Sequence, residues 1–196
     1  MTAPDRQRWS AISQAFHWLI VALILVMAYL GLTMVDLPDT PHKIFFYMLH
    51  KSTGMTILVL GVLRLAWRLY AGRPAVLSGI PRWQAHLATL THGALYVLLF
   101  ALPLSGWLLN SSTGFPLRWF NLVNLPPLAS RSDALHEVVR PLHEALFWAL
   151  VVLALAHAAA AIYHHLFQRD DTLVRMLPRG WLRAPSAQAQ TEHPHA

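Results

Sequence analysis

The sequence predicts an all-α protein: an integral membrane four-helix bundle with both termini in the cytoplasm. Of the 196 residues, 56% are hydrophobic and only 12% are charged, about half the charged fraction of an ordinary soluble domain. Three stretches contain no Asp, Glu, Lys or Arg, namely 9–35, 83–117 and 145–168. Each exceeds the roughly 20 apolar residues that a bilayer-spanning helix needs.

The first and last of these stretches predict helices over about residues 10–34 and 136–167. A further helix is expected over about 44–69, where an uncharged core from Ser52 to Leu63 is flanked by basic residues. Long basic side chains near helix ends can extend to the membrane surface, so these charges are compatible with a span.

The middle stretch is longer than one helix requires. Pro116 and the Asn-Ser-Ser-Thr-Gly run at 110–114 are typical of a turn. We therefore expect the third helix over about 84–109, followed by a long loop over 110–135.

Most of the 15 Lys and Arg residues fall on one side of these helices. That side holds Arg6, Arg8, Arg64, Arg68, Arg73, Arg82, Arg169, Arg175, Arg179 and Arg183. The other side holds Lys43, Lys51, Arg118, Arg131 and Arg140, with several carboxylates beside them. Because cytoplasmic segments carry the basic excess, both termini are predicted to be cytoplasmic.

Residues 1–178 are interpreted as one transmembrane domain, and the polar segment 179–196 as a disordered cytoplasmic tail. No Ala-x-Ala site follows the first helix, so no cleaved secretory signal is expected. The positive charge is explained by orientation beside anionic lipid headgroups, and no nucleic-acid partner is expected.

Cysteine is absent, which excludes thiolate metal sites, iron–sulfur ligation, disulfides and covalently attached c-type haem. Histidine, in contrast, occurs 12 times, against 9 Asp and Glu residues. Imidazole is costly to bury in an apolar environment without a partner. Histidines inside the predicted spans therefore mark the functional site.

The fourth predicted helix carries histidines separated by multiples of seven residues, at His136, His143, His157 and His164. Seven residues are close to two helical turns, so these side chains form one stripe facing the bundle. Two of them, His143 and His157, lie inside the membrane, about 21 Å apart at the helical rise of 1.5 Å per residue.

A neighbouring helix supplies one histidine at each of these two depths. His17 matches the cytoplasmic level of His157, and His50 matches the outer level of His143. Haem has two axial positions on opposite faces, so two such pairs suit two non-covalent b-type haems with bis-histidine ligation. Six-coordinate haem has no open position for oxygen, which predicts electron transfer as the task.

Two other interpretations of the histidines remain. A zinc or copper transporter usually needs three or four ligands at one point, and the chain contains no His-x-x-x-His. Alternatively, each histidine could bond a backbone carbonyl and serve structure only. Gly54, one turn after His50, fits close approach of a haem and ordinary helix packing equally well.

Haem propionates are anionic and need partners near the membrane surfaces. Arg64 and Arg68 are candidates at the cytoplasmic level, and Lys51 and Arg140 at the outer level. Simple extension of these side chains to the interface explains them equally well.

The combined motifs resemble the bacterial cytochrome b561 family, over about residues 8 to 178. The resemblance is carried by Phe16-His17-Trp18, by Leu49-His50-Lys51-Ser52-Thr53-Gly54, by Leu102-Pro103-Leu104-Ser105-Gly106-Trp107, by the spacing of His143 and His157, and by His164-His165-Leu166-Phe167 with the run from Asp171 to Pro178.

This resemblance implies a four-helix inner-membrane protein with two haem b groups, the inner one held by His17 and His157 and the outer one by His50 and His143. It also implies exchange of electrons with the quinone pool, with ubiquinone as acceptor or donor, and, in some members, oxidation of superoxide. A cytochrome subunit that serves a partner dehydrogenase is the alternative.

Several further residues have weaker expectations. His92 matches a family histidine but has no obvious partner at its depth, so we expect it either to support a ligand or to lie at the interface, where it could assist proton transfer. His42, His86, His164 and His165 are expected at the membrane surfaces, and Asp170 and Asp171 as solvated charges at a helix end. The loop 110–135 contains Trp119 and Phe120 and could cover the outer haem, bind quinone or a partner, or cap the bundle.

Overall fold

The computed structural model describes residues 8–72, 74–75 and 80–182. Four long helices make up most of it: α1 (Ala11–Met34), α2 (Pro41–Ala71), α3 (Arg82–Thr113) and α4 (Asp133–Tyr163). Each is long and apolar enough to cross a membrane. The predicted four-helix membrane bundle is therefore confirmed.

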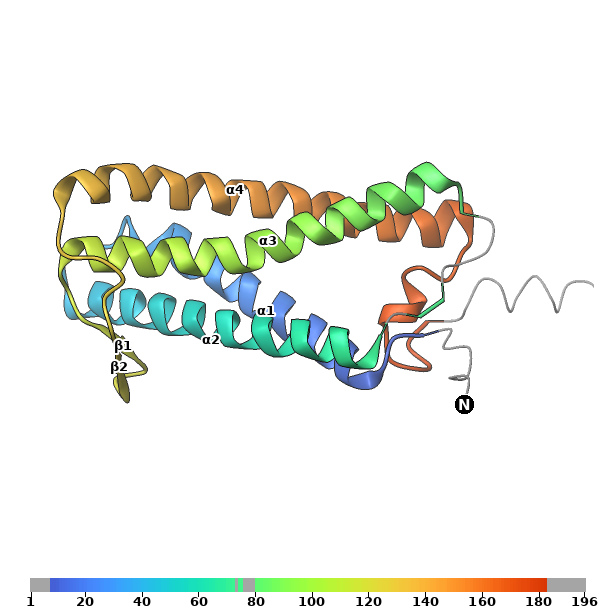
Figure 1. Ribbon diagram of the computed structural model, residues 1–196, viewed down its shortest axis with the longest axis horizontal. Helices are drawn as coiled ribbons and strands as arrows, with labels where there is room; N and C mark the ends of the chain where they lie inside the picture. The colour runs from blue at the N-terminus through green and yellow to red at the C-terminus, as the bar shows by residue number, and fades with distance from the viewer. Residues whose placement is uncertain (1–7, 73, 76–79, 183–196) are drawn as a thin grey trace, which may run out of the picture.

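The helices form two packed pairs. α1 packs along α2 and α3 along α4, with α2 and α3 joining the pairs (Figure 1). α1 begins and α4 ends at the right of Figure 1, which we call the terminal end. The opposite end, where α3 connects to α4 through a small hairpin, is the hairpin end.

Three helices start earlier than the charge pattern predicts, α3 by two residues at Arg82 and the other two by three residues. α2 begins at Pro41 rather than near 44, because proline suits the first helical turn and Lys43 is tolerated there. α4 begins at Asp133 rather than near 136, since the Ser132 hydroxyl accepts a hydrogen bond from the Leu135 amide.

The expected end of α3 near Leu109 is wrong: the helix continues to Thr113. The polar residues of this last turn hydrogen-bond to their own helix, as Ser112 Oγ does to the Leu109 carbonyl at 2.7 Å. The helix stops at Gly114, whose φ of 77° is the left-handed conformation that glycine adopts freely. Serine and threonine here extend the helix instead of opening a loop.

The connection from α3 to α4 contains two short antiparallel strands, β1 (Leu117–Trp119) and β2 (Val123–Leu125). Their turn is anchored to α2. The Phe120 amide donates to Ser52 Oγ at 2.9 Å, and the Trp119 indole donates to Thr56 Oγ1 at 3.1 Å. Ser52 has no exposed surface, so the hairpin packs firmly on the helix that carries His50.

At the other end, α4 continues as a π-helical turn, His164–Gln168, and the chain then crosses to the start of α1. We call residues 170–178 the closing segment. It receives hydrogen bonds from Arg8 to the Val174 carbonyl at 2.6 Å and from the Trp18 indole to the Met176 carbonyl at 2.9 Å. This segment ties α4 to α1, which otherwise belong to different helix pairs.

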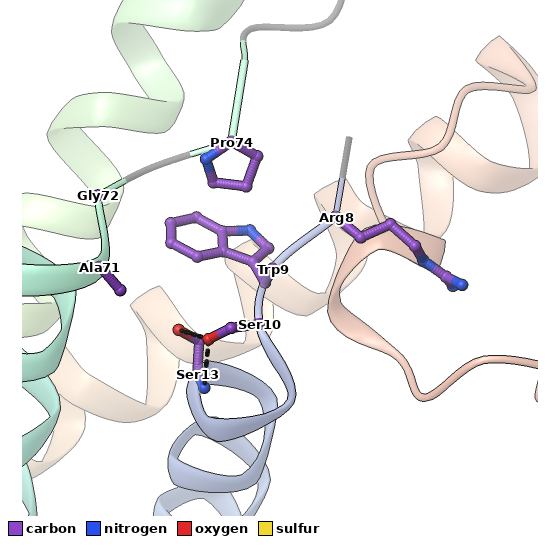
Figure 2. Close-up of a pocket in the computed structure, with 7 residues that line it drawn as sticks. All are labelled: Arg8, Trp9, Ser10, Ser13, Ala71, Gly72 and Pro74. Carbon is purple, nitrogen blue, oxygen red and sulfur yellow. Dashed lines mark hydrogen bonds between the residues drawn. The ribbon is translucent and has the colours of Figure 1, made fainter. Parts of the chain in front are cut away.

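Where α1 meets the end of α2, the Trp9 indole lies between Pro74 and Ala71 (Figure 2). The cavity in this region measures about 10 Å³, which holds at most one water molecule. It is a packing void whose lining includes none of the histidines.

The apolar core is formed by one residue from each of three helices, Ile20, Ile57 and Leu99. Each lies along its helix between the two levels that carry histidines. The predicted disordered tail falls largely on residues 183–196, outside the described residues, as do Arg6, Arg73 and Arg183 of the charge pattern.

Candidate functional site

The structure brings the four predicted ligands together as two pairs. His17 of α1 faces His157 of α4 with ring centroids 6.4 Å apart, and His50 of α2 faces His143 of α4, also at 6.4 Å. We call these the terminal-end pair and the hairpin-end pair. In both pairs the ring planes are close to perpendicular, at 83° and 77°.

This separation can be compared with that of two axial ligands. A metal–nitrogen bond to imidazole is about 2.0–2.1 Å, and the ring centroid lies about 1.1 Å beyond the nitrogen, so two rings on opposite sides of one metal have centroids about 6.3 Å apart. Edge-to-face ring contacts also have centroids about 4.5–7 Å apart. The spacing of both pairs is therefore compatible with one metal atom between the rings but does not by itself require it.

His92 of α3 is a third histidine at the terminal end, and the expectation that it lacks a partner is wrong. Its ring centroid lies 5.1 Å from that of His157, too close for two ligands on opposite sides of one metal. Its Nδ1 is 2.6 Å from the Ala88 carbonyl of its own helix. His92 thus supports the ring of His157, and only its match to a family position pointed to it.

Two glycines make space for the hairpin-end pair. A Cβ atom on Gly31 of α1 would lie 3.1 Å from Cε1 of His50, and one on Gly106 of α3 would lie 3.1 Å from Cε1 of His143. Both distances are tighter than ordinary contacts. Glycine at these positions therefore lets each imidazole lie directly against a helix backbone.

The second nitrogens of this pair have different surroundings. Nδ1 of His143 lies 2.8 Å from Ser105 Oγ, whereas Nδ1 of His50 is buried without a hydrogen-bond partner among the described residues. An unpartnered buried nitrogen is costly. The spacing and the glycines together fit a bis-imidazole site.

At the terminal end, basic and aromatic side chains surround His17. Arg64 Nη1 lies 3.1 Å from Nδ1 of His17. The guanidinium groups of Arg64 and Arg68 both lie over the ring of Tyr96, at 5.7 and 5.1 Å from its centroid. Cation–π contacts hold these arginines inside the bundle, next to the terminal-end pair.

The basic residues predicted for the outer level differ from each other. Lys51 is half-buried and donates a hydrogen bond to Asn110 Oδ1 at 3.1 Å. Arg140 is exposed on α4. A Cβ atom added to Gly54 would lie 3.4 Å from Cε of Met27, which is an ordinary contact distance. This glycine serves helix packing between α1 and α2.

Asp170 is not simply a solvated charge. Its carboxylate lies 2.6 Å from Nδ1 of His164 and accepts the Thr172 amide at 2.8 Å. Burial opposes its ionisation, but these hydrogen bonds outweigh burial and hold the pKa of Asp170 below its ordinary value. The pair His164–Asp170 therefore anchors the start of the closing segment.

No group of three His, Asp or Glu side chains is arranged to hold a metal ion in the part of the chain that the structure describes. This gives no support to a metal-transport site. Paired histidines at two depths of an apolar helix bundle instead define the class of membrane-bound cytochromes with non-covalent haem.

Comparison with known proteins identifies the family. The chain matches the prokaryotic cytochrome b561 family over residues 8–179 and belongs to it. Family membership implies haem b, electron transport and a place in the bacterial inner membrane.

Three relatives cover nearly the whole chain. Cytochrome b561 homolog 2 of Escherichia coli (strain K12) is 36% identical over 174 residues, 87% of this chain and 92% of that protein. Cytochrome b561 homolog 1 of the same organism is 30% identical over 88% of this chain and 98% of its own length. The probable superoxide oxidase CybB of Yersinia pestis is 26% identical over 88% and 97%.

Proposed function

We propose that this cytochrome binds two b haems and transfers electrons between a donor at the hairpin end and the quinone pool. His17 and His157 hold one haem, and His50 and His143 hold the other. The observation that carries the proposal is the spacing of 6.4 Å in both pairs, which suits two axial imidazoles.

The role of the protein is to hold and insulate each site. Bound haem supplies one-electron redox chemistry. A haem held by two of these imidazoles would supply electron transfer rather than reactions with bound oxygen. The apolar cluster of Ile20, Ile57 and Leu99 lies between the levels of the two sites.

The orientation is part of the proposal. Among the described residues, the terminal end carries Arg8, Arg64, Arg68, Arg82, Arg169, Arg175 and Arg179. This excess supports a cytoplasmic terminal end and a hairpin end on the outer side. Arg64 and Arg68 are then available to the propionates of the inner haem, and Lys51 and Arg140 to those of the outer haem.

Superoxide is the proposed donor and ubiquinone the proposed acceptor. One relative is named as a probable superoxide oxidase. Lys51 and the exposed Arg140 add positive charge at the hairpin end, which attracts a small anion. On this proposal the chain is a superoxide:ubiquinone oxidoreductase.

Stopped-flow absorbance of the purified, detergent-solubilised protein tests the proposal. A superoxide-generating system should reduce the oxidised haems, and superoxide dismutase should abolish that reduction. Ubiquinone should then reoxidise them. Exchange with ubiquinone but not with superoxide would refute the donor and retain a quinol-linked carrier.

A second function is a cytochrome subunit that relays electrons for a partner dehydrogenase. Phe115 and Leu122 lie in the connection at the hairpin end, outside the long helices, and are 72% and 84% exposed. Such side chains can contact a second protein. Haems that exchange electrons with neither superoxide nor ubiquinone, together with co-purification of a second subunit, would favour this function.

A further inference from the structure

We propose that Ser105 is a positioning residue for His143: its hydroxyl fixes the tautomer and the orientation of that imidazole at the hairpin-end site. The inference rests on the proposed function, because it concerns how a haem ligand is held. It means that Ser105 influences the redox potential of the hairpin-end site and not that of the terminal-end site.

The hydrogen bonds around Ser105 define the direction of this interaction. The side chain is buried, with 8% of its surface exposed. Its hydroxyl donates to the Leu102 carbonyl at 2.8 Å, and Nδ1 of His143 lies 2.8 Å from the same oxygen. A hydroxyl has one proton. Since that proton is directed to Leu102, the oxygen accepts from His143, and Nδ1 carries the proton.

This assignment leaves Nε2 of His143 as the unprotonated nitrogen that can bind a metal. A hydrogen-bond acceptor on the other ring nitrogen fixes the ring plane and makes the ligand more basic. A more basic ligand stabilises the oxidised metal over the reduced metal. His50, the other member of the pair, has no such partner on Nδ1 among the described residues. Ser105 therefore influences the redox potential of the hairpin-end site through His143 alone.

The same helices provide a matched comparison seven residues away on each. Ser112 Oγ lies 3.3 Å from Nδ1 of His136 and donates to the Leu109 carbonyl at 2.7 Å. Because α3 and α4 run in opposite directions, a step of seven residues forward on α3 and seven back on α4 leads from the Ser105–His143 contact to the Ser112–His136 contact. His136 belongs to neither histidine pair, so this contact is structural and tests what a buried serine contributes to packing alone.

The experiment uses the full chain in detergent as wild type and as Ser105→Ala, Ser105→Thr and Ser112→Ala. For each protein, a pyridine haemochrome assay gives the haem content and a spectroscopic redox titration gives the midpoint potentials. Low-spin ferric electron paramagnetic resonance reports the orientation of the ligand planes. None of these measurements depends on turnover.

In Ser105→Ala, we expect one of the two redox components to shift to higher potential. At a fixed applied potential, its ratio of reduced to oxidised haem should rise about fivefold, the effect of one hydrogen bond. Its resonance signal should also change, because the ring is less constrained. Ser105→Thr keeps the hydroxyl and should match the wild type, and Ser112→Ala should leave both components unchanged.

Loss of one haem in Ser105→Ala, with both retained in Ser105→Thr, would also support the inference. Titrations of Ser105→Ala that superimpose on those of the wild type would overturn it. So would equal losses in Ser105→Ala and Ser105→Thr, because size rather than the hydroxyl would then matter. A wild type with fewer than two haems would instead refute the proposed function.

Discussion

Replacing Gly106 by alanine tests the hairpin-end site with a single methyl group. The added Cβ would lie 3.1 Å from Cε1 of His143. Ordinary van der Waals contact begins near 3.4 Å, so the ring must retreat by a few tenths of an ångström. Metal–ligand distances tolerate about 0.2 Å. The methyl group therefore displaces the ligand by more than its bond to a metal accepts.

We expect Gly106→Ala to weaken haem binding at this site about tenfold or more, as loss of ligand support does in other metal sites, and to leave the other haem in place. Gly31→Ala should have the same effect through His50, because its Cβ also falls at 3.1 Å. Two substitutions on different helices should thus affect one redox component.

Gly93→Ala is the matched control on the same helix. A Cβ at Gly93 meets nothing within 4 Å, and alanine favours a helix over glycine by about 0.5–1 kcal/mol. It should keep both haems and match or exceed the wild-type stability. The haem-to-protein ratio and a redox titration are the assays. Full haem content and unchanged spectra in Gly106→Ala, or loss of the other component, would refute the assignment.

Three further predictions follow from the same structure. Alanine at either member of one pair should abolish the same redox component in a potentiometric titration. His17→Ala should therefore match His157→Ala, and His50→Ala should match His143→Ala. Loss of the same component by members of different pairs would show that the depths are misassigned. The rate of haem reduction by superoxide should fall as the salt concentration rises, because charges are screened over about 10 Å at 0.1 M. The double variant Lys51→Gln with Arg140→Gln should slow that reduction while the rate at which ubiquinone oxidises the haems stays nearly constant. Rates that do not depend on salt would argue against electrostatic steering. Asp170→Asn should lower the melting temperature at pH 7, and by progressively less as the pH falls below the ordinary aspartate range, since a carboxylate with a lowered pKa contributes stability that is lost as pH falls through that pKa. Equal destabilisation at every pH would assign the effect to packing.

The sequence predicts the bundle and the histidine pairs well because both depend on spacing. Long apolar stretches specify membrane helices, and a rise of 1.5 Å per residue sets the depth of each histidine. His17 and His157 meet because α1 begins and α4 ends at the terminal end, and His50 and His143 meet because α2 and α4 both begin at the hairpin end. Neither pairing requires knowledge of side-chain conformation.

Local hydrogen bonding decides what the sequence does not predict. Ser112 and Thr113 are typical of a loop, yet their hydroxyls bond back to carbonyls of α3 and extend it. The contact of His92 with His157 depends on how α3 rotates about its axis. The docking of Phe120 on Ser52 depends on the hairpin turn. Each results from tertiary packing that no periodic pattern encodes.

The haem-to-chain ratio of the purified wild-type protein tests the central claim most directly. A pyridine haemochrome assay combined with quantitative amino-acid analysis should give about two b-type haems per chain, because the two histidine pairs share the spacing of axial ligands. A ratio of one or zero would contradict the account, since at least one pair would then be a structural contact only.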